Sequence, residues 1–135
     1  PSRSHKALLE GIEKTRRNDR MTLVLALNYS AKWEILEAVR KLASQAATGE
    51  LEPDAISEEH FSRALATSGM PDPELLIRTS GESRISNFLL WQIAYAELYF
   101  TDIFWPEFRK ENLYQAIIDY QNRERRFGKT SDQLA

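Results

Sequence analysis

Residues 74–97 read ELLIRTSGESRISNFLLWQIAYAE, and the interpretation of the whole chain starts from this stretch. An apolar run ends in Arg78, and a loop of small and hydroxyl-bearing residues follows it. The run predicts a short buried strand over 74–78. Ligands in open α/β sheets lie outside the carboxyl ends of such strands. A ligand is therefore expected at the loop that begins after Arg78.

Three polar side chains at this loop have the chemistry of an anion site. Arg78 and Arg84 stand six residues apart, and Ser86 follows them. Guanidinium groups bind phosphate through paired, charge-assisted hydrogen bonds. Hydroxyls and loop N–H groups can bind the remaining oxygens. A surface loop with two solvated arginines is the alternative, and the position after a strand disfavours it. The stretch predicts a phosphate or pyrophosphate site.

The upstream segment has the same order of strand, turn and helix. Residues 21–28, MTLVLALN, form an apolar run that is typical of a strand covered on both faces. The turn that follows leads into a predicted helix over 31–47, whose apolar residues keep helical spacing. Asn28 is either a cap for this helix or a ligand at a second sheet edge, and the sequence favours neither interpretation.

The remaining elements complete a layered α/β fold with a mostly parallel sheet flanked by helices. Further helices are predicted over 4–18, 57–67, 87–95 and 110–126, and a third strand over 96–101. The 87–95 helix is expected to be almost wholly buried and to serve core packing. Three strands are few for a closed core, which predicts an incomplete domain with further strands upstream.

Composition restricts the class of protein. A chain of 135 residues is one domain or part of one. Its net charge of −2 gives no general case for binding nucleic acid or a membrane surface. The absence of cysteine excludes disulfides and thiolate zinc sites, and fits a reducing compartment. No apolar run approaches the roughly 20 residues of a membrane span. The start at Pro1, without an initiator Met, suggests a fragment.

The last predicted helix ends in a basic segment that includes Arg123, Arg125 and Arg126. Basic side chains at a helix C-terminus complement the helix dipole, which is the structural explanation for them. Phosphate binding is the functional alternative. Residues 130–135 are expected to form a flexible tail.

The run IRTSGESRISNFLLWQIAYAELYFTDIFWPEF, residues 77–108, resembles the C-terminal signature of the cis-prenyltransferases, the family of the undecaprenyl diphosphate synthases. The similarity extends more loosely to the Asn28-Tyr29 turn and to the Arg-Phe-Gly end at 126–128. It implies that residues 1–129 are the C-terminal part of such a domain. The family's N-terminal strands and Asp-Gly-Asn phosphate loop have no counterpart here, so catalytic residues are expected upstream.

The resemblance implies a reaction and a site. The family condenses isopentenyl diphosphate with an allylic diphosphate, such as farnesyl diphosphate, into a long-chain polyprenyl diphosphate of the undecaprenyl type. Arg78, Arg84 and Ser86 are then expected to hold the pyrophosphate of isopentenyl diphosphate. Glu97 is expected to take part in binding Mg²⁺, which prefers carboxylate, phosphate and water oxygens.

The resemblance also implies a homodimer, in which Arg126 and Gly128 reach the pyrophosphate of the partner. Asn28 is a lesser candidate for substrate binding, because Lys32 stands where the family usually has arginine and Ser30-Ala31 where it usually has two glycines. The expected location is cytoplasmic and peripheral at the inner face of the membrane, with membrane contact only through the lipid product.

Two other functions remain as alternatives. The chain could be a non-catalytic anion-binding subunit or module that needs a partner chain for chemistry. It could also be an α/β enzyme of another phosphate-binding family, although it has neither a Gly-rich dinucleotide motif nor a Walker loop. Because the allylic site is expected upstream, the 135-residue chain alone is expected to show no prenyl transfer.

Overall fold

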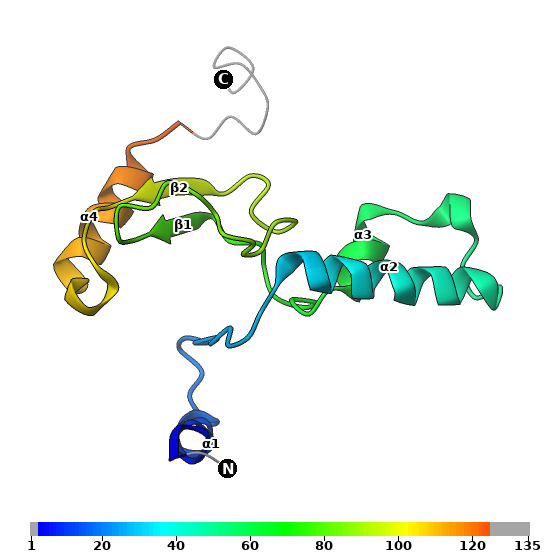
Figure 1. Ribbon diagram of the computed structural model, residues 1–135, viewed down its shortest axis with the longest axis horizontal. Coiled ribbons are helices and arrows are strands. Elements are labelled where there is room, and N and C mark those ends of the chain that lie inside the picture. Colours follow the sequence, from blue (N-terminus) through cyan, green and yellow to red (C-terminus); the bar gives the residue numbers. More distant parts are fainter. Residues whose placement is uncertain (1–2, 125–135) are drawn as a thin grey trace.

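The computed structural model describes residues 3–124 and has an α/β architecture (Figure 1). Its helices are α1 (Arg3–Thr15), α2 (Ala31–Ala47), α3 (Glu58–Ala64) and α4 (Lys110–Gln121). The short 3-10 helices η1 (Pro53–Ala55) and η2 (Trp105–Glu107) precede α3 and α4. The layered α/β class predicted from the sequence is confirmed.

Two strands, β1 (Leu75–Arg78) and β2 (Glu97–Phe100), form a parallel sheet. Leu75 pairs with Glu97 and Arg78 with Phe100, so the carboxyl ends of both strands lie at one edge. Both strands were predicted from the sequence to within a residue or two. The register places Arg78 at the sheet edge where ligands are expected.

The elements pack in two groups. Helix α2 lies against α3, and α4 lies against β2 in the sheet (Figure 1). Helix α1 stands apart in Figure 1 and has no buried residue. Within residues 3–124, no helix is long and apolar enough to cross a membrane.

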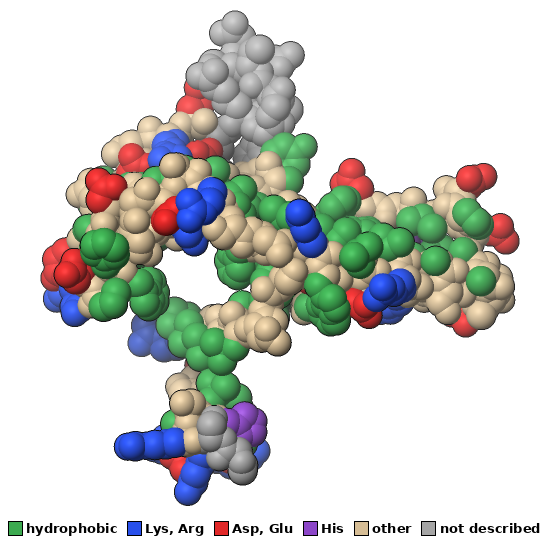
Figure 2. Space-filling view, viewed as in Figure 1, with side chains coloured by type: hydrophobic (Ala, Val, Ile, Leu, Met, Phe, Trp, Pro, Cys, Tyr) green, Lys and Arg blue, Asp and Glu red, His purple; other side chains and the backbone are tan. Residues whose placement is uncertain are grey.

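The predicted strand over 21–28 is not formed. The segment has no regular secondary structure, and Leu23 and Leu27 are 75% and 71% exposed. Figure 2 shows its apolar side chains as a green surface between α1 and the rest of the molecule. An apolar run becomes a strand only when its backbone pairs with a neighbour. No strand among residues 3–124 lies beside this one, so the prediction fails.

The predicted buried helix over 87–95 is also wrong. These residues form a series of turns, and within them only Gln92 and Ile93 are buried. Asn87 and Leu89 have φ angles of +62° and +48°, which a right-handed helix excludes. The segment is apolar, as a buried helix would be, but its contacts with α2 determine its backbone conformation.

The remaining helices follow the sequence closely. Helix α2 starts where predicted, after Ser30, whose hydroxyl accepts a hydrogen bond from the Trp33 N–H at 3.3 Å. The helices predicted over 4–18, 57–67 and 110–126 each end three to five residues early, at Thr15, Ala64 and Gln121. The spacing of apolar residues determines the ends of a helix less well than its interior.

Candidate anion-binding site

The loop after β1 is bonded to the chain that leaves β2. The Thr101 N–H donates to the Arg78 carbonyl at 2.9 Å, and the Gly81 N–H donates to the Thr101 carbonyl at 3.0 Å. The Ser80 N–H donates to the Ile103 carbonyl at 2.9 Å. These bonds hold the first residues of the loop against the chain that leaves β2, at the carboxyl edge of the sheet.

Gly81 is required by this geometry, and its replacement gives a testable prediction. Its φ is +66°, and an added Cβ would lie 3.1 Å from Asp102 Oδ1. We expect Gly81→Ala to lower the free energy of unfolding by about 1 kcal/mol, measured by urea denaturation of the 135-residue chain. Gly11→Ala in α1, where the added Cβ meets nothing within 4 Å, is the control and should not destabilise. Equal effects of the two substitutions would contradict this role for Gly81.

Arg78 is partly buried and lines a cavity. Its Nε is buried, and no residue from Arg3 to Glu124 accepts a hydrogen bond from it. Arg78 lines a cavity of about 330 Å³ together with the apolar residues Leu76, Ile85, Phe88, Leu89 and Ile93. A buried donor without an acceptor costs about 1–3 kcal/mol. An anionic oxygen that entered the cavity would remove this cost.

Arg84 and Ser86 flank Ile85, one of the residues that line the Arg78 cavity. Arg84 forms an ion pair with Glu82 on the exposed loop. Ser86 is exposed and has a φ of +58°. Of the three residues that the sequence predicted as an anion site, only Arg78 lines the cavity, and Arg84 and Ser86 are exposed on the loop beside it.

Asn87 links this loop to the start of α2. Its carbonyl accepts from the Ala31 N–H at 3.0 Å, and its Oδ1 accepts from the Lys32 N–H at 2.9 Å. Its Nδ2 donates to Ser30 Oγ at 2.9 Å. The two turns that the sequence marked as ligand edges therefore meet at this residue.

Asn28 lies two residues before Ser30, with an exposed side chain and a φ of +58°. It does not cap α2, because Ser30 is the N-cap residue. The capping interpretation of Asn28 is wrong. Substrate binding by Asn28 stays a prediction.

Glu97 is held by Arg123. Arg123 Nη1 donates to Glu97 Oε2 at 2.9 Å and to the Leu98 carbonyl at 3.0 Å. Arg123 Nε donates to Asp119 Oδ2 at 2.9 Å. The hydrogen bond that Arg123 donates to Glu97 is the main cause that raises the pKa of Arg123 above its ordinary value. The cluster joins the end of α4 to the start of β2.

Glu97 and Arg78 do not meet within one chain. Paired residues on neighbouring strands point to the same face, and successive residues alternate between faces. Glu97 is level with Leu75, three residues before Arg78, so the two side chains leave opposite faces of the sheet. The Glu97 carboxylate therefore does not fit a Mg²⁺ ion on a diphosphate held by Arg78 of the same chain. Residues 3–124 also contain no cluster of three or more His, Cys, Asp or Glu side chains.

Arg126 and Gly128 lie outside the described residues, as do the end of the predicted domain and the tail over 130–135. The predictions for these residues concern a part of the chain about which the structure says nothing.

The sequence did not predict the polar network around Glu34. Glu34 is 3% exposed. Its Oε1 accepts from Gln92 Nε2 at 2.9 Å and from the Tyr29 hydroxyl, and its Oε2 accepts from the Ala66 N–H at 3.1 Å. Burial, followed by the bond to Glu34, raises the pKa of Tyr29 above its ordinary value. A signal was present, because Ala31, Glu34, Ala38 and Leu42 share the buried face of α2 at helical spacing.

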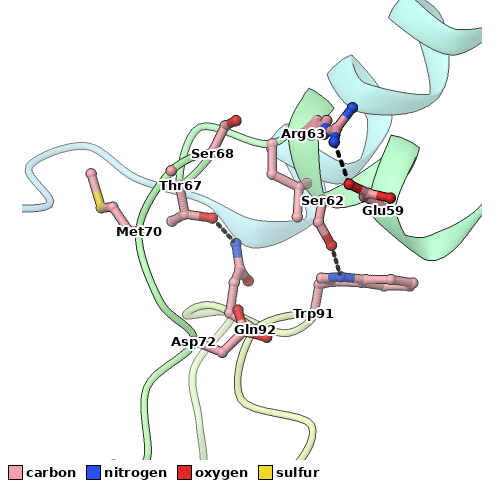
Figure 3. A pocket seen from close by; sticks show the side chains of 11 residues that line it. Glu59, Ser62, Arg63, Thr67, Ser68, Met70, Asp72, Trp91 and Gln92 are labelled. Carbon is pink, nitrogen blue, oxygen red and sulfur yellow. Dashed lines mark hydrogen bonds and ion pairs between the residues drawn. The ribbon is translucent and has the colours of Figure 1, made fainter.

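A second cavity, of about 120 Å³, lies between α3 and the turn at 91–92 (Figure 3). Trp91 Nε1 donates to Ser62 Oγ at 3.1 Å, and Gln92 Nε2 donates to Thr67 Oγ1 at 2.9 Å. The predicted site residues that the structure describes do not line this cavity.

Comparison with known proteins defines the class. Residues 1–128 match the prenyltransferase family model described as "Putative undecaprenyl diphosphate synthase". The chain is 54% identical over 134 residues to an isoprenyl transferase of Chlorobaculum tepidum, covering 99% of this chain and 51% of that protein. It is 56% identical over 128 residues to a ditrans,polycis-undecaprenyl-diphosphate synthase of Micrococcus luteus that is specific for (2E,6E)-farnesyl diphosphate, covering 95% and 51%.

Solved structures agree with this result. The crystal structure of lavandulyl diphosphate synthase from Lavandula x intermedia, in complex with dimethylallyl diphosphate, matches with a TM-score of 0.84 and 38% identity. The match covers 93% of this chain and 54% of that one. A probable undecaprenyl diphosphate synthase from Campylobacter jejuni matches with a TM-score of 0.71 and 33% identity, covering 96% and 58%.

The fold is thus that of a prenyl diphosphate synthase. The chain belongs to the prenyltransferase family of the undecaprenyl diphosphate synthases. It spans about half the length of the curated relatives that it matches.

Proposed function

We propose that this chain is the C-terminal part of a cis-prenyltransferase and supplies its binding site for isopentenyl diphosphate. The whole enzyme would join isopentenyl diphosphate to an allylic diphosphate, such as farnesyl diphosphate, and make a long-chain polyprenyl diphosphate of the undecaprenyl type. The product would be a lipid carrier for cell-wall synthesis. Membership of the family supports the reaction class.

One observation carries the assignment of the site. The Arg78 Nε is buried beside a cavity of about 330 Å³, and the described residues offer it no acceptor. A diphosphate carries several anionic oxygens and matches a guanidinium in geometry and charge. The apolar lining from Ile85 and Phe88 suits the short hydrocarbon part of isopentenyl diphosphate.

The roles of the three site residues follow from their positions. Arg78 would bind the diphosphate from the partly buried side of the cavity. Arg84 would leave Glu82 and bind the diphosphate from the exposed side, and Ser86 would add one hydrogen bond. Such contacts hold the alkene in a fixed orientation for attack on the allylic carbon. Asn28 is proposed as a lesser contact.

The remaining proposals concern the assembled enzyme. We propose Mg²⁺ as its divalent cation, which would neutralise diphosphate charge when bound. Glu97 would bind a Mg²⁺ ion through its carboxylate. The diphosphate bound to that ion would not be the one at the Arg78 loop of the same chain. We also propose a homodimer in which Arg126 and Gly128 reach the partner's diphosphate. The location would be cytoplasmic, peripheral at the inner face of the membrane.

The test uses a completed enzyme, in which this chain follows the N-terminal half of the Chlorobaculum tepidum isoprenyl transferase. Transfer is measured with labelled isopentenyl diphosphate and farnesyl diphosphate. We expect the completed enzyme to make polyprenyl diphosphate and the 135-residue chain to make none. Binding of isopentenyl diphosphate without transfer by the completed enzyme would favour the alternative, a non-catalytic anion-binding module. Binding of other phosphate esters in place of isopentenyl diphosphate would overturn the proposed function and favour an enzyme of another phosphate-binding family.

A further inference from the structure

Asn87 lies between the site residue Ser86 and the cavity-lining residue Phe88. It uses its carbonyl and both ends of its side-chain amide to bind the first turn of α2, in three hydrogen bonds of 2.9–3.0 Å. The bonds join segments 55 to 57 residues apart in the chain. No neighbouring residue in the loop has comparable bonds to α2, among those that the structure describes.

The backbone at this point needs such an anchor. Ser86 and Asn87 have φ angles of +58° and +62°, in the left-handed region. Each non-glycine residue in that region costs about 1 kcal/mol or more, and asparagine tolerates it better than most. Strained residues persist where the surroundings over-determine their conformation. Here the surroundings are the N–H groups of Ala31 and Lys32 and the hydroxyl of Ser30.

The start of α2 is therefore occupied by the loop itself. The N–H groups of Ala31 and Lys32 already donate to Asn87. These N–H groups hold the loop that carries Arg84 and Ser86. An anion at the site would therefore contact the side chains of Arg84 and Ser86, and not the N–H groups of α2. The turn before α2 thus contributes to the site through Asn87.

We infer that Asn87 is a positioning residue for the isopentenyl diphosphate site. It fixes the backbone between Ile85 and Phe88, which both line the Arg78 cavity, before the ligand arrives. This inference rests on the proposed function. Ordering a loop in advance removes part of the entropy cost of binding, so losing the anchor should weaken binding of one substrate selectively.

The experiment separates the effect of the Asn87 side-chain amide from the effect of its left-handed backbone conformation. Asn87→Gly keeps the left-handed backbone accessible but removes both side-chain bonds. Asn87→Asp keeps an acceptor for the Lys32 N–H and loses the donor to Ser30. In the completed enzyme we expect Asn87→Gly to raise the KM for isopentenyl diphosphate by about tenfold, with the KM for farnesyl diphosphate within about twofold of wild type. Asn87→Asp should restore part of the loss.

Asn112 provides a matched control. Its Oδ1 accepts a hydrogen bond from the Arg109 N–H at 2.7 Å, so it also binds a backbone N–H at the start of a helix, here α4. Asn112→Ala should leave both KM values unchanged. The melting temperature of each variant is measured in parallel.

The outcomes separate the two ideas. If wild type transfers prenyl groups and Asn87→Gly alters both KM values equally, or neither, the positioning role is overturned and the proposed function stands. Such a result, with a lowered melting temperature, would mean that Asn87 only stabilises the fold. If the wild-type completed enzyme neither binds isopentenyl diphosphate nor transfers it, the proposed function is overturned, and the inference falls with it.

Discussion

Arg78→Ala in the completed enzyme is expected to lower kcat/KM for isopentenyl diphosphate by on the order of 100-fold. The substitution removes a partly buried guanidinium whose Nε has no acceptor among residues 3–124. Hydrogen bonds to charged groups contribute about 1.5–3 kcal/mol, and about 1.4 kcal/mol is a factor of ten. Losing the contacts of one arginine to a diphosphate should therefore cost tenfold to a few hundredfold. Steady-state kinetics with farnesyl diphosphate saturating measures the effect.

The control is an arginine outside the site. Arg40 is exposed on α2 and pairs with Glu37. Arg40→Ala should leave kcat/KM within about twofold, because surface ion pairs contribute little. Arg84→Ala, on the exposed loop next to the cavity-lining residue Ile85, should lower kcat/KM by at least about tenfold. Wild-type kinetics for Arg78→Ala would remove the cavity from the proposed site.

Arg78→Lys distinguishes charge from geometry. Lysine keeps the positive charge but presents a single ammonium group instead of a planar fork. If paired hydrogen bonds to the diphosphate matter, Arg78→Lys should recover only a minor part of the activity lost in Arg78→Ala. Full recovery would show that charge alone is sufficient at this position.

Glu34→Ala is expected to lower the free energy of unfolding of the chain by about 2–4 kcal/mol. Glu34 is 3% exposed, and its carboxylate accepts hydrogen bonds from three groups, on Tyr29, Gln92 and Ala66. Removing it leaves those donors without their acceptor, and each buried unsatisfied group costs about 1–3 kcal/mol. Water that enters the space would recover part of the cost. Urea denaturation followed by circular dichroism measures the change.

The same helix supplies the control. Glu37 lies one turn later, with its side chain 43% exposed and paired with Arg40. Glu37→Ala should change the free energy of unfolding by no more than about 0.5 kcal/mol. Glu34→Gln keeps an acceptor and should fall between the two alanine variants. A loss for Glu34→Ala as small as that for Glu37→Ala would mean that the network does not hold α2 in place.

The position of the candidate site was predictable from the sequence. A short apolar run that ends in Arg78 predicts a strand, and ligands in open α/β sheets lie at the carboxyl ends of strands. Arg84 and Ser86 follow within one loop, so the chain itself keeps them near Arg78 in sequence. Their part in binding stays a prediction.

Two elements failed for one physical reason. The apolar pattern of 21–28 is that of a buried strand, but pairing depends on a neighbour that the local sequence does not contain. The segment 87–95 has a helical composition, but Asn87 bonds to α2 and its backbone turns left-handed. Tertiary contacts override local preference in both cases.

Glu97 shows that the register between two strands determines which side chains can act together. The family resemblance implied that Glu97 takes part in binding Mg²⁺ near the site at Arg78. The parallel register places it on the opposite face of the sheet from Arg78, where Arg123 binds it. A shift of one residue would reverse the face, and no pattern in a single strand determines the register with its neighbour.

The sequence by itself determined the α/β class, the resemblance to the cis-prenyltransferases and the loop that carries Arg78, Arg84 and Ser86. These depend on composition and on spacing along the chain. Only the tertiary structure decided that Asn87 joins this loop to α2, that Glu34 lies in a buried network, and that Glu97 faces away from Arg78. Each of these depends on a contact between segments far apart in sequence, and local propensity contains no information about such contacts.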